Sequence, residues 1–168
     1  IGHIEGGEAT RALLRAQVGR ERKPFGDSLV VVTGAASGIG RATAAAFAAE
    51  GAEVVVSDID EAGVTATAAQ IAAAGAVAHP YVVDVSDAAA VEAFAEQVCA
   101  THGVPDIVVN NAGIGVAGAF LDTPAEQFDR VLDVNLGGVV NGCRAFARRL
   151  VDRGTGGHIV NVASMAAY

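Results

Sequence analysis

A run of apolar residues that ends in a turn with three glycines constrains the fold of this chain more than any other feature. Residues 29–32 read Leu-Val-Val-Val, and glycines follow at positions 34, 38 and 40. An alanine-rich stretch with helical character, Arg41–Phe47, comes directly after them. In such a strand–turn–helix unit, the first backbone N–H groups of the helix can bind an anion. The segment therefore predicts a phosphate-binding turn after a buried strand; a purely structural glycine turn is the alternative.

The same alternation of strand and helix continues to the end of the chain. After the first strand, 29–33, further strands are expected at 53–57, 77–83, 107–109 and 158–163. Helices are expected at 38–50 and 61–74, from an N-cap at Ser86 or Asp87 to His102, from an N-cap at Thr123 to Val134, and over 136–152. The strands are continuous apolar runs, which is typical of strands covered on both faces. We therefore predict an α/β fold, a Rossmann-type doubly wound parallel sheet in three layers with strand order 3-2-1-4-5.

Residues 1–28 do not follow this alternation. We expect one helix over 8–19 and a linker over 20–27, and we predict a single nucleotide-binding domain over 29–168. No stretch of about 18 strongly apolar residues suggests a membrane span. A net charge of −8 argues against a nucleic-acid partner. The two cysteines, Cys99 and Cys143, are predicted to be buried free thiols, which favours a reducing, cytoplasmic location.

Acidic residues end two of the predicted strands. Asp58 follows the second strand, 18 residues after Gly40, where a carboxylate can accept hydrogen bonds from both ribose hydroxyls of a dinucleotide. It would also repel a 2′-phosphate, so NAD is favoured over NADP. Asp84 ends the third strand and is followed by Val85. For both acids, capping of the following helix is the alternative.

Amides and a hydroxyl mark the second half of the chain. Asn110-Asn111-Ala112-Gly113 follows the fourth strand, Asn135 lies in a helical stretch, and Ser164 follows the fifth strand. Asparagine is a mediocre helix former, so Asn135 indicates either a distorted helix or a helix boundary. A serine at the carboxyl end of a parallel strand faces the ligand crevice of a doubly wound sheet, although such a residue is ordinarily part of a turn.

These motifs, in this order, resemble those of the short-chain dehydrogenase/reductase family over about residues 28–168. The resemblance implies that the cofactor is held by the turn residues Thr33, Gly34, Ser37, Gly38, Ile39 and Gly40, by Asp58, Asp84 and Val85, and by Asn111, Ala112 and Gly113. It implies that Asn135 distorts its helix and anchors a water in a proton relay. It also implies that Ser164 hydrogen-bonds the carbonyl or alcohol of the substrate.

The resemblance breaks at the end of the chain. The family's acid–base chemistry uses a Tyr-x-x-x-Lys pair well beyond its serine, whereas Tyr168 lies only four residues after Ser164 and ends the chain. We therefore expect an incomplete domain that is inactive alone. The first 28 residues are similar to the tail of an upstream domain, as in fusions of this family behind an α/β-hydrolase.

The implied function is that of an NAD-dependent oxidoreductase that interconverts an alcohol and a ketone or aldehyde. A non-catalytic dinucleotide-binding module and a dehydratase or epimerase are the alternatives. Gly115–Phe120 and Met165–Tyr168 are small and apolar, which favours a small apolar substrate. The family resemblance implies a homo-oligomer. His79, His102 and His158 show no metal-ligand spacing, so no metal site is predicted.

Overall fold

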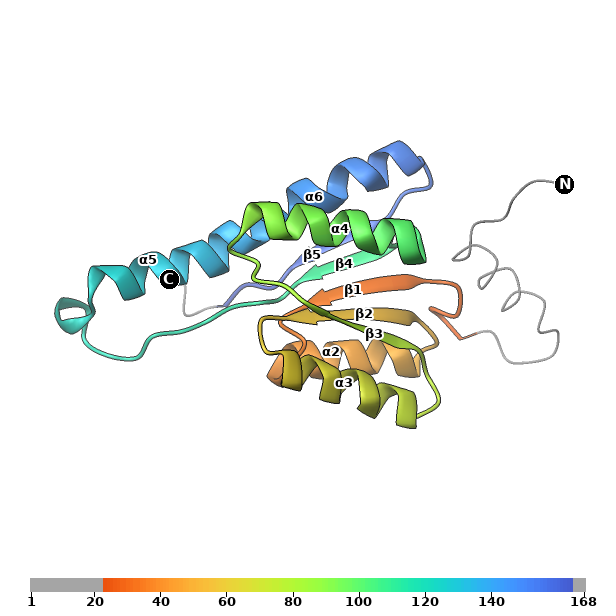
Figure 1. Cartoon of the computed structure of the whole chain (residues 1–168), viewed down its shortest axis with the longest axis horizontal. Coiled ribbons are helices and arrows are strands. Elements are labelled where there is room, and N and C mark those ends of the chain that lie inside the picture. Colours follow the sequence, from red (N-terminus) through yellow and green to blue (C-terminus); the bar gives the residue numbers. More distant parts are fainter. Residues whose placement is uncertain (1–22, 165–168) are drawn as a thin grey trace, which may run out of the picture.

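A five-stranded parallel sheet forms the centre of the computed structural model, which describes residues 23–164 (Figure 1). The helix expected at 8–19 lies outside the described residues. The strands are β1 (Leu29–Thr33), β2 (Glu53–Asp58), β3 (Ala78–Val82), β4 (Ile107–Asn110) and β5 (His158–Asn161). Their order in the sheet is β3-β2-β1-β4-β5, as predicted. Val31 of β1 pairs with Val55 on one side and with Val108 on the other.

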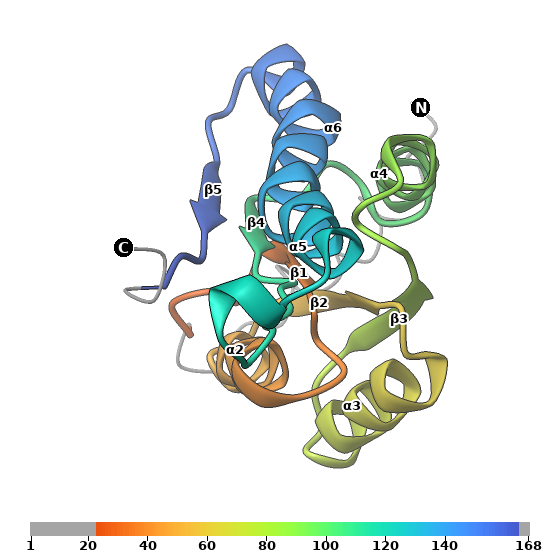
Figure 2. The ribbon, with the colours of Figure 1, turned by 90° about the vertical axis from the view of Figure 1, so that its left-hand side faces the viewer.

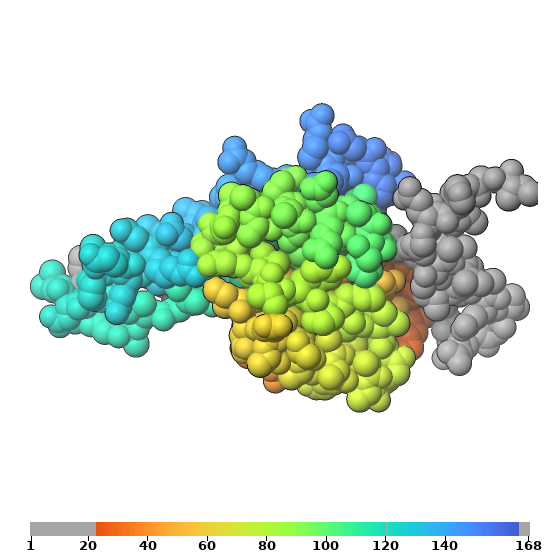
Figure 3. Space-filling model, viewed as in Figure 1, coloured from red at the N-terminus to blue at the C-terminus, as the bar shows by residue number. Residues whose placement is uncertain are grey.

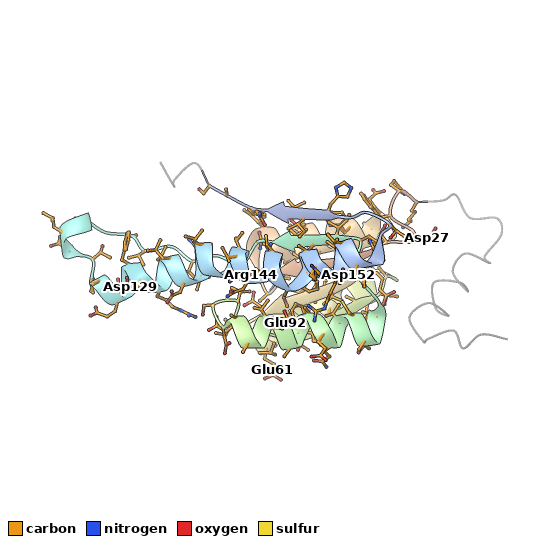
Figure 4. The ribbon with its side chains drawn as sticks, turned by 90° about the horizontal axis from the view of Figure 1, so that it is seen from above. Asp27, Glu61, Glu92, Asp129, Arg144 and Asp152 are labelled. Atoms are coloured by element: carbon orange, nitrogen blue, oxygen red, sulfur yellow. The ribbon has the colours of Figure 1, made fainter. Side chains whose placement is uncertain are left out.

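Helices cover both faces of the sheet and complete three layers. Figure 2 shows α2 (Gly38–Ala49) and α3 (Glu61–Ala73) on one face, with α4 (Ala88–His102) and α6 (Gly138–Arg153) on the other. An ion pair of 2.8 Å between Arg149 and Glu92 links α6 to α4. Figure 4 labels Glu92 on α4, where it lies beside α6. The doubly wound architecture expected from the sequence is therefore present.

The three inner strands are buried on both faces because their successive side chains point to opposite layers. Leu29, Val31, Val55 and Val108 belong to one apolar cluster, together with Phe94 of α4 and Phe146 of α6. Val30, Val32, Val54 and Val56 belong to a second cluster, which includes residues of α2 and α3. A continuous run of valines thus supplies both cores at once.

The edge strands are shorter and more exposed than expected. β3 covers 78–82 instead of 77–83, and β5 covers 158–161 instead of 158–163. Val82 and Val160 are 55% and 45% exposed. An edge strand pairs on one side only among the described residues, so its ends are less well held. The two cysteines are free, as predicted, but they are half-buried rather than buried.

A side chain caps the start of α4, as predicted, but none caps the start of α5. Asp87, not Ser86, caps α4, because its carboxylate accepts from the backbone N–H groups of Ala89 and Ala90. The predicted cap at Thr123 is wrong: α5 (Ala125–Leu132) begins after Pro124, which occupies the N-cap position. The Thr123 hydroxyl instead donates to the Ala119 carbonyl, 3.1 Å away.

A projecting arm extends beyond the carboxyl ends of the strands. It consists of the loop 113–119, the short 3₁₀ turn Phe120–Asp122 and α5. The space-filling view shows this arm standing out from the rounded body of the molecule (Figure 3). A π-helical turn, Asp133–Gly137, joins α5 to α6. Two helices were expected here, and the π turn is what separates them.

Candidate cofactor site

A crevice of about 340 Å³ lies at the carboxyl ends of the inner strands. Many residues predicted to hold a cofactor line it together: Gly34, Ser37, Gly38, Ile39, Asp58, Asp84, Val85, Asn111, Ala112 and Gly113. Ile59, Val83, Ile114, Arg130 and Val134 complete the lining. The structure thus brings four separate sequence motifs to one crevice, at the position where doubly wound sheets bind their ligands.

The glycine turn closes tightly against the end of β4. Gly34 has a φ of +68°, and a Cβ there would lie 2.6 Å from the Cα of Ala112. A Cβ on Gly40 would overlap the carbonyl oxygen of Gly34. Around Gly38, whose φ is +52°, nothing lies within 4 Å of the Cβ position. The turn is therefore packed on its inner side and open on the side of the crevice, beside the start of α2.

Thr33 and Asn111 join the ends of β1 and β4 beneath the crevice. The Thr33 hydroxyl accepts from the backbone N–H groups of Asn111 and Ala112, both at 3.0 Å. The Asn111 side-chain amide donates to the Thr33 carbonyl at 2.9 Å. Thr33 does not line the crevice, and neither does buried Gly40. Both residues set the shape of the turn that does.

Asp58 connects the glycine turn to β2. Its Oδ2 accepts from the Ala36 N–H at 3.0 Å, and its Oδ1 accepts from the Asp60 N–H at 3.1 Å. Asp60, not Asp58, caps α3, because its carboxylate accepts from the Gly63 N–H. A carboxylate offers about four acceptor positions, so Asp58 retains capacity toward the crevice that it lines.

A guanidinium that the sequence reasoning missed lies behind this turn. Arg41 of α2 donates to the Ala36 carbonyl and, at 3.0 Å, to the Thr67 hydroxyl. Arg41 is absent from the crevice lining, so its charge is directed to the layer between α2 and α3. It supports the loop whose Ala36 N–H contacts Asp58.

Asp84 lies in a polar cluster that closes the crevice on the side of α5. It accepts from the Ser86 hydroxyl at 2.7 Å and from the Ser86 N–H at 2.9 Å, and it pairs with Arg130 at 3.0 Å. The hydrogen bond from the Ser86 side chain, with help from Arg130, holds the pKa of Asp84 below its usual range. Arg130 lies 46 residues further along the sequence, and only the tertiary structure brings this residue of α5 to the crevice.

Two asparagines hold backbone segments that line the crevice. Asn135 lies in the π-helical turn, and its side chain both accepts from the Ile114 N–H and donates to the Ile114 carbonyl, each at 2.9 Å. Asn141 of α6 donates to the Val85 carbonyl at 2.9 Å. Asn135 itself is not among the lining residues. Nothing in the sequence pattern singled out Asn141.

Ser164 is not part of the crevice lining. It is exposed and lies beyond the end of β5. Tyr168 and the rest of the segment 165–168, predicted to line a substrate pocket, lie outside the described residues. Within the described chain, the cofactor half of the predicted site is therefore gathered, and the catalytic half is not.

The structure brings two of the three histidines of this part of the chain together. His79 and His102, which show no metal-ligand spacing along the chain, meet at the far end of the sheet together with Glu53. His158, on β5, is exposed and does not join them.

The model of the family described as "short chain dehydrogenase" matches residues 28–168. The chain belongs to this short-chain dehydrogenase family. "Probable oxidoreductase EphD" of Mycobacterium tuberculosis is 78% identical over 164 residues, which make up 98% of this chain and 28% of that protein. D-threitol dehydrogenase of Mycolicibacterium smegmatis is 40% identical over 139 residues, 83% of this chain and 53% of that enzyme. The chain thus spans about half or less of these relatives.

Solved structures of short-chain dehydrogenases share the fold. One from Burkholderia phymatum in complex with NAD has a TM-score of 0.81 and 35% identity, covering 88% of this chain and 52% of that chain. A metagenomic short-chain oxidoreductase in complex with NADP has a TM-score of 0.80 and 36% identity, covering 86% of this chain and 65% of that chain. Structural neighbours therefore bind either dinucleotide. Within residues 23–164, no helix is long and apolar enough to cross a bilayer.

Proposed function

We propose that this chain supplies the cofactor-binding part of an oxidoreductase that uses NAD to interconvert an alcohol and a ketone or aldehyde. The observation that carries the proposal is Asp58, an acceptor at the end of β2 that lines the same crevice as the glycine turn. The bound nicotinamide would supply the hydride acceptor or donor. The chain's own residues would bind it and orient it.

Different residues of the crevice suit different parts of a dinucleotide. The turn over Gly34–Gly40 and the start of α2 suit a pyrophosphate, because glycines allow close approach and the helix N-terminus favours an anion. The Asp58 carboxylate would accept from ribose hydroxyls and repel a 2′-phosphate. The Arg41 guanidinium behind this loop already donates to Ala36 and Thr67, which supports NAD over NADP.

The remaining predicted roles follow from the strand ends. Asp84 and Val85 would contact the adenine, with Arg130 limiting how far the Asp84 carboxylate can turn. Asn111, Ala112 and Gly113 would border a ribose, with Asn111 held by Thr33.

Catalysis would need groups beyond the crevice. We propose that the Ser164 hydroxyl hydrogen-bonds the substrate oxygen and that Asn135 supports the proton relay of the family. A tyrosine–lysine pair would move the proton, and Tyr168 lies too close to Ser164 to be that tyrosine. We accordingly expect the 168 residues alone to bind the dinucleotide without turning over substrate.

The surroundings of the crevice support the remaining expectations. Ile114 and Val116 are exposed on the loop after β4, which favours a small apolar substrate. Phe128, Leu132 and Leu136 are exposed along α5 and the π turn, and a homo-oligomer would bury them. The free, half-buried cysteines fit a cytoplasmic protein.

The test compares binding of NADH and NADPH to the wild type and to Asp58→Ala by nucleotide fluorescence. Because hydrogen bonds to a charged group contribute about 1.5–3 kcal/mol, we expect NADH affinity to fall about tenfold or more. NADPH affinity should stay constant or rise, since the repulsion is removed. An equal loss for both nucleotides would show that Asp58 only supports the turn, and wild-type preference for NADPH would refute the assignment of NAD.

A further inference from the structure

A cluster of two histidines and a carboxylate lies at the end of the sheet opposite the crevice. Glu53 is the first residue of β2, His79 is the second residue of β3, and His102 is the last residue of α4. Asp58, at the other end of β2, lines the crevice. Five residue steps of about 3.3 Å each separate the two ends by roughly 16 Å, so the cluster is no part of the cofactor site.

The sheet and the helix bring these three side chains to one point. Val54 pairs with Ala78 and Val55 with His79, so Glu53 lies beside the start of β3. Glu53 and Val55 share a face of β2, and His79 and Tyr81 share a face of β3, because side chains alternate along a strand. This is the face that α4 covers, and His102 closes the group from the end of α4.

The spacing of the donor atoms matches the ligand set of a small metal ion. The Glu53 Oε1 lies 2.8 Å from the His79 Nε2 and 3.6 Å from the His102 Nδ1. All three donor atoms lie within 4.8 Å of one another. Ligands at about 2.0–2.1 Å from a tetrahedral zinc ion are about 3.3 Å apart, so small side-chain movements would admit the ion.

Tyr81 supplies a second layer of contacts. Its hydroxyl lies 2.9 Å from the His102 Nε2 and therefore directs the Nδ1 toward Glu53. Metal-bound histidines almost always use their other ring nitrogen in such a hydrogen bond. The His102 and Glu53 side chains are only 10% and 17% exposed, whereas that of His79 is 31% exposed and gives an ion access.

We propose that Glu53, His79 and His102 bind a divalent transition metal ion of the zinc class. Two imidazole nitrogens and one carboxylate suit zinc, nickel or copper better than calcium or magnesium, which prefer oxygen ligands. Water would take the fourth position. The ion would displace the proton between His79 and Glu53, and it would tie β2, β3 and the end of α4 together without touching the crevice.

Isothermal titration with Zn²⁺, on the longest natural chain that carries these residues, tests the proposal. The variants are His79→Gln and the matched control His158→Gln, which changes an exposed histidine on β5. We expect one Zn²⁺ bound through this cluster, at least tenfold weaker binding in His79→Gln, and unchanged binding in the control. Binding that is equally strong in both variants, or absent from the wild type, would overturn the proposal.

A second measurement keeps the test decisive if His79→Gln folds poorly. Tyr81→Phe keeps all three ligands but removes the hydrogen bond to His102, so Zn²⁺ affinity should fall about tenfold. Co²⁺ in place of Zn²⁺ should give the visible absorption of a tetrahedral site in the wild type and the His158→Gln control. A Co²⁺ spectrum typical of six oxygen ligands would contradict the predicted ligand set.

Discussion

Asn135 holds the backbone of Ile114 from both sides, with Oδ1 accepting from the N–H and Nδ2 donating to the carbonyl, each at 2.9 Å. Ile114 lines the crevice, whereas Asn135 lies in the π-helical turn between α5 and α6. The turn and the loop after β4 are therefore locked together. This arrangement gives Asn135 a structural task that is separate from its proposed part in a proton relay.

Replacing Asn135 with Ala should release the loop around Ile114. With two hydrogen bonds of about 1 kcal/mol each removed at an exposed site, we expect about 1–2 kcal/mol lower stability in urea unfolding. NADH affinity should fall several-fold as the loop loses order. Asn135→Asp, which can still accept from the Ile114 N–H, should lie between the wild type and Asn135→Ala. If all three chains were equally stable, the contact would contribute nothing.

The glycine turn should respond differently at two positions. Gly40→Ala places a methyl group onto the Gly34 carbonyl, so we expect a loss of about 3 kcal/mol or more and a large unfolded fraction. Gly38→Ala meets no neighbour, but its φ of +52° is unfavourable for alanine by about 1–2 kcal/mol. Circular dichroism and NADH binding should find the Gly38 variant folded but weak in binding. A stable Gly40→Ala protein would contradict the packing described above.

The Asp84–Arg130 pair should make stability depend on pH. The folded-state pKa of Asp84 is lowered, chiefly by the Ser86 hydroxyl, so the contribution is present above the unfolded-state pKa of 3.8 and is lost as pH falls below it. The Arg130 and Asp84 side chains are 45% and 33% exposed. Because solvent screens such a pair, it should contribute only about 0.5 kcal/mol to the free energy of unfolding.

A double-mutant cycle of Asp84→Asn and Arg130→Ala, measured by denaturant unfolding at pH 7, isolates this contribution. The same cycle at a pH well below 3.8 should give a coupling energy near zero. A coupling energy that did not change with pH would show that the charge of Asp84 is not involved.

Asp106 should be one of the main stabilising acids of the sheet. Its Oδ2 accepts from the N–H of fully buried Leu29 at 2.8 Å, and its Oδ1 pairs with Arg153 at 3.0 Å. Asp106→Ala would leave the Leu29 N–H without an acceptor, so we expect about 2 kcal/mol lower stability. Asp106→Asn keeps an acceptor and should lose less. Equal losses in thermal unfolding would indicate that the ion pair, not the Leu29 contact, dominates.

Cys99 should be a poor nucleophile at neutral pH. Burial against α6 raises the pKa of its thiol, and the nearby Arg149 and Arg153 offset this only in part. In a Cys143→Ser background, alkylation by iodoacetamide should be slower than that of free cysteine, and its rate should still climb above pH 9.0. Unfolding in urea serves as the control, since it should restore the ordinary rate. A rate that levels off below pH 9 would contradict the burial argument.

The sequence predicted the sheet order and the cofactor crevice because both depend on local signals. A largely β-branched run such as Leu29–Val32, ended by a glycine turn, favours a strand buried on both faces, and strand ends in a parallel sheet share one edge. The positions of Asp58 and Asn111 after strands therefore predicted that both would lie at this edge, and both line the crevice. The exact ends of β3 and β5 could not be predicted from the sequence, because an edge strand is hydrogen-bonded to only one neighbouring strand.

Contacts between elements that are distant in the sequence could not be predicted, for a physical reason. Arg130 meets Asp84 only because the fold brings this residue of α5 to the crevice, and His79 meets His102 only because α4 ends beside β3. No periodicity or spacing along the chain encodes these meetings. They follow from tertiary packing, which brings together residues 46 and 23 positions apart.

The exposed edge at β5 favours self-association of the 168-residue chain. Among residues 23–164, β5 pairs only with β4, so the backbone groups on its other side face away from the sheet, beside the exposed Val160 and Val162. Such an edge is a template onto which a strand of another molecule can add. At high concentration the 168-residue chain should thus self-associate through strand addition, and a lysine introduced at Val160 should keep it dispersed.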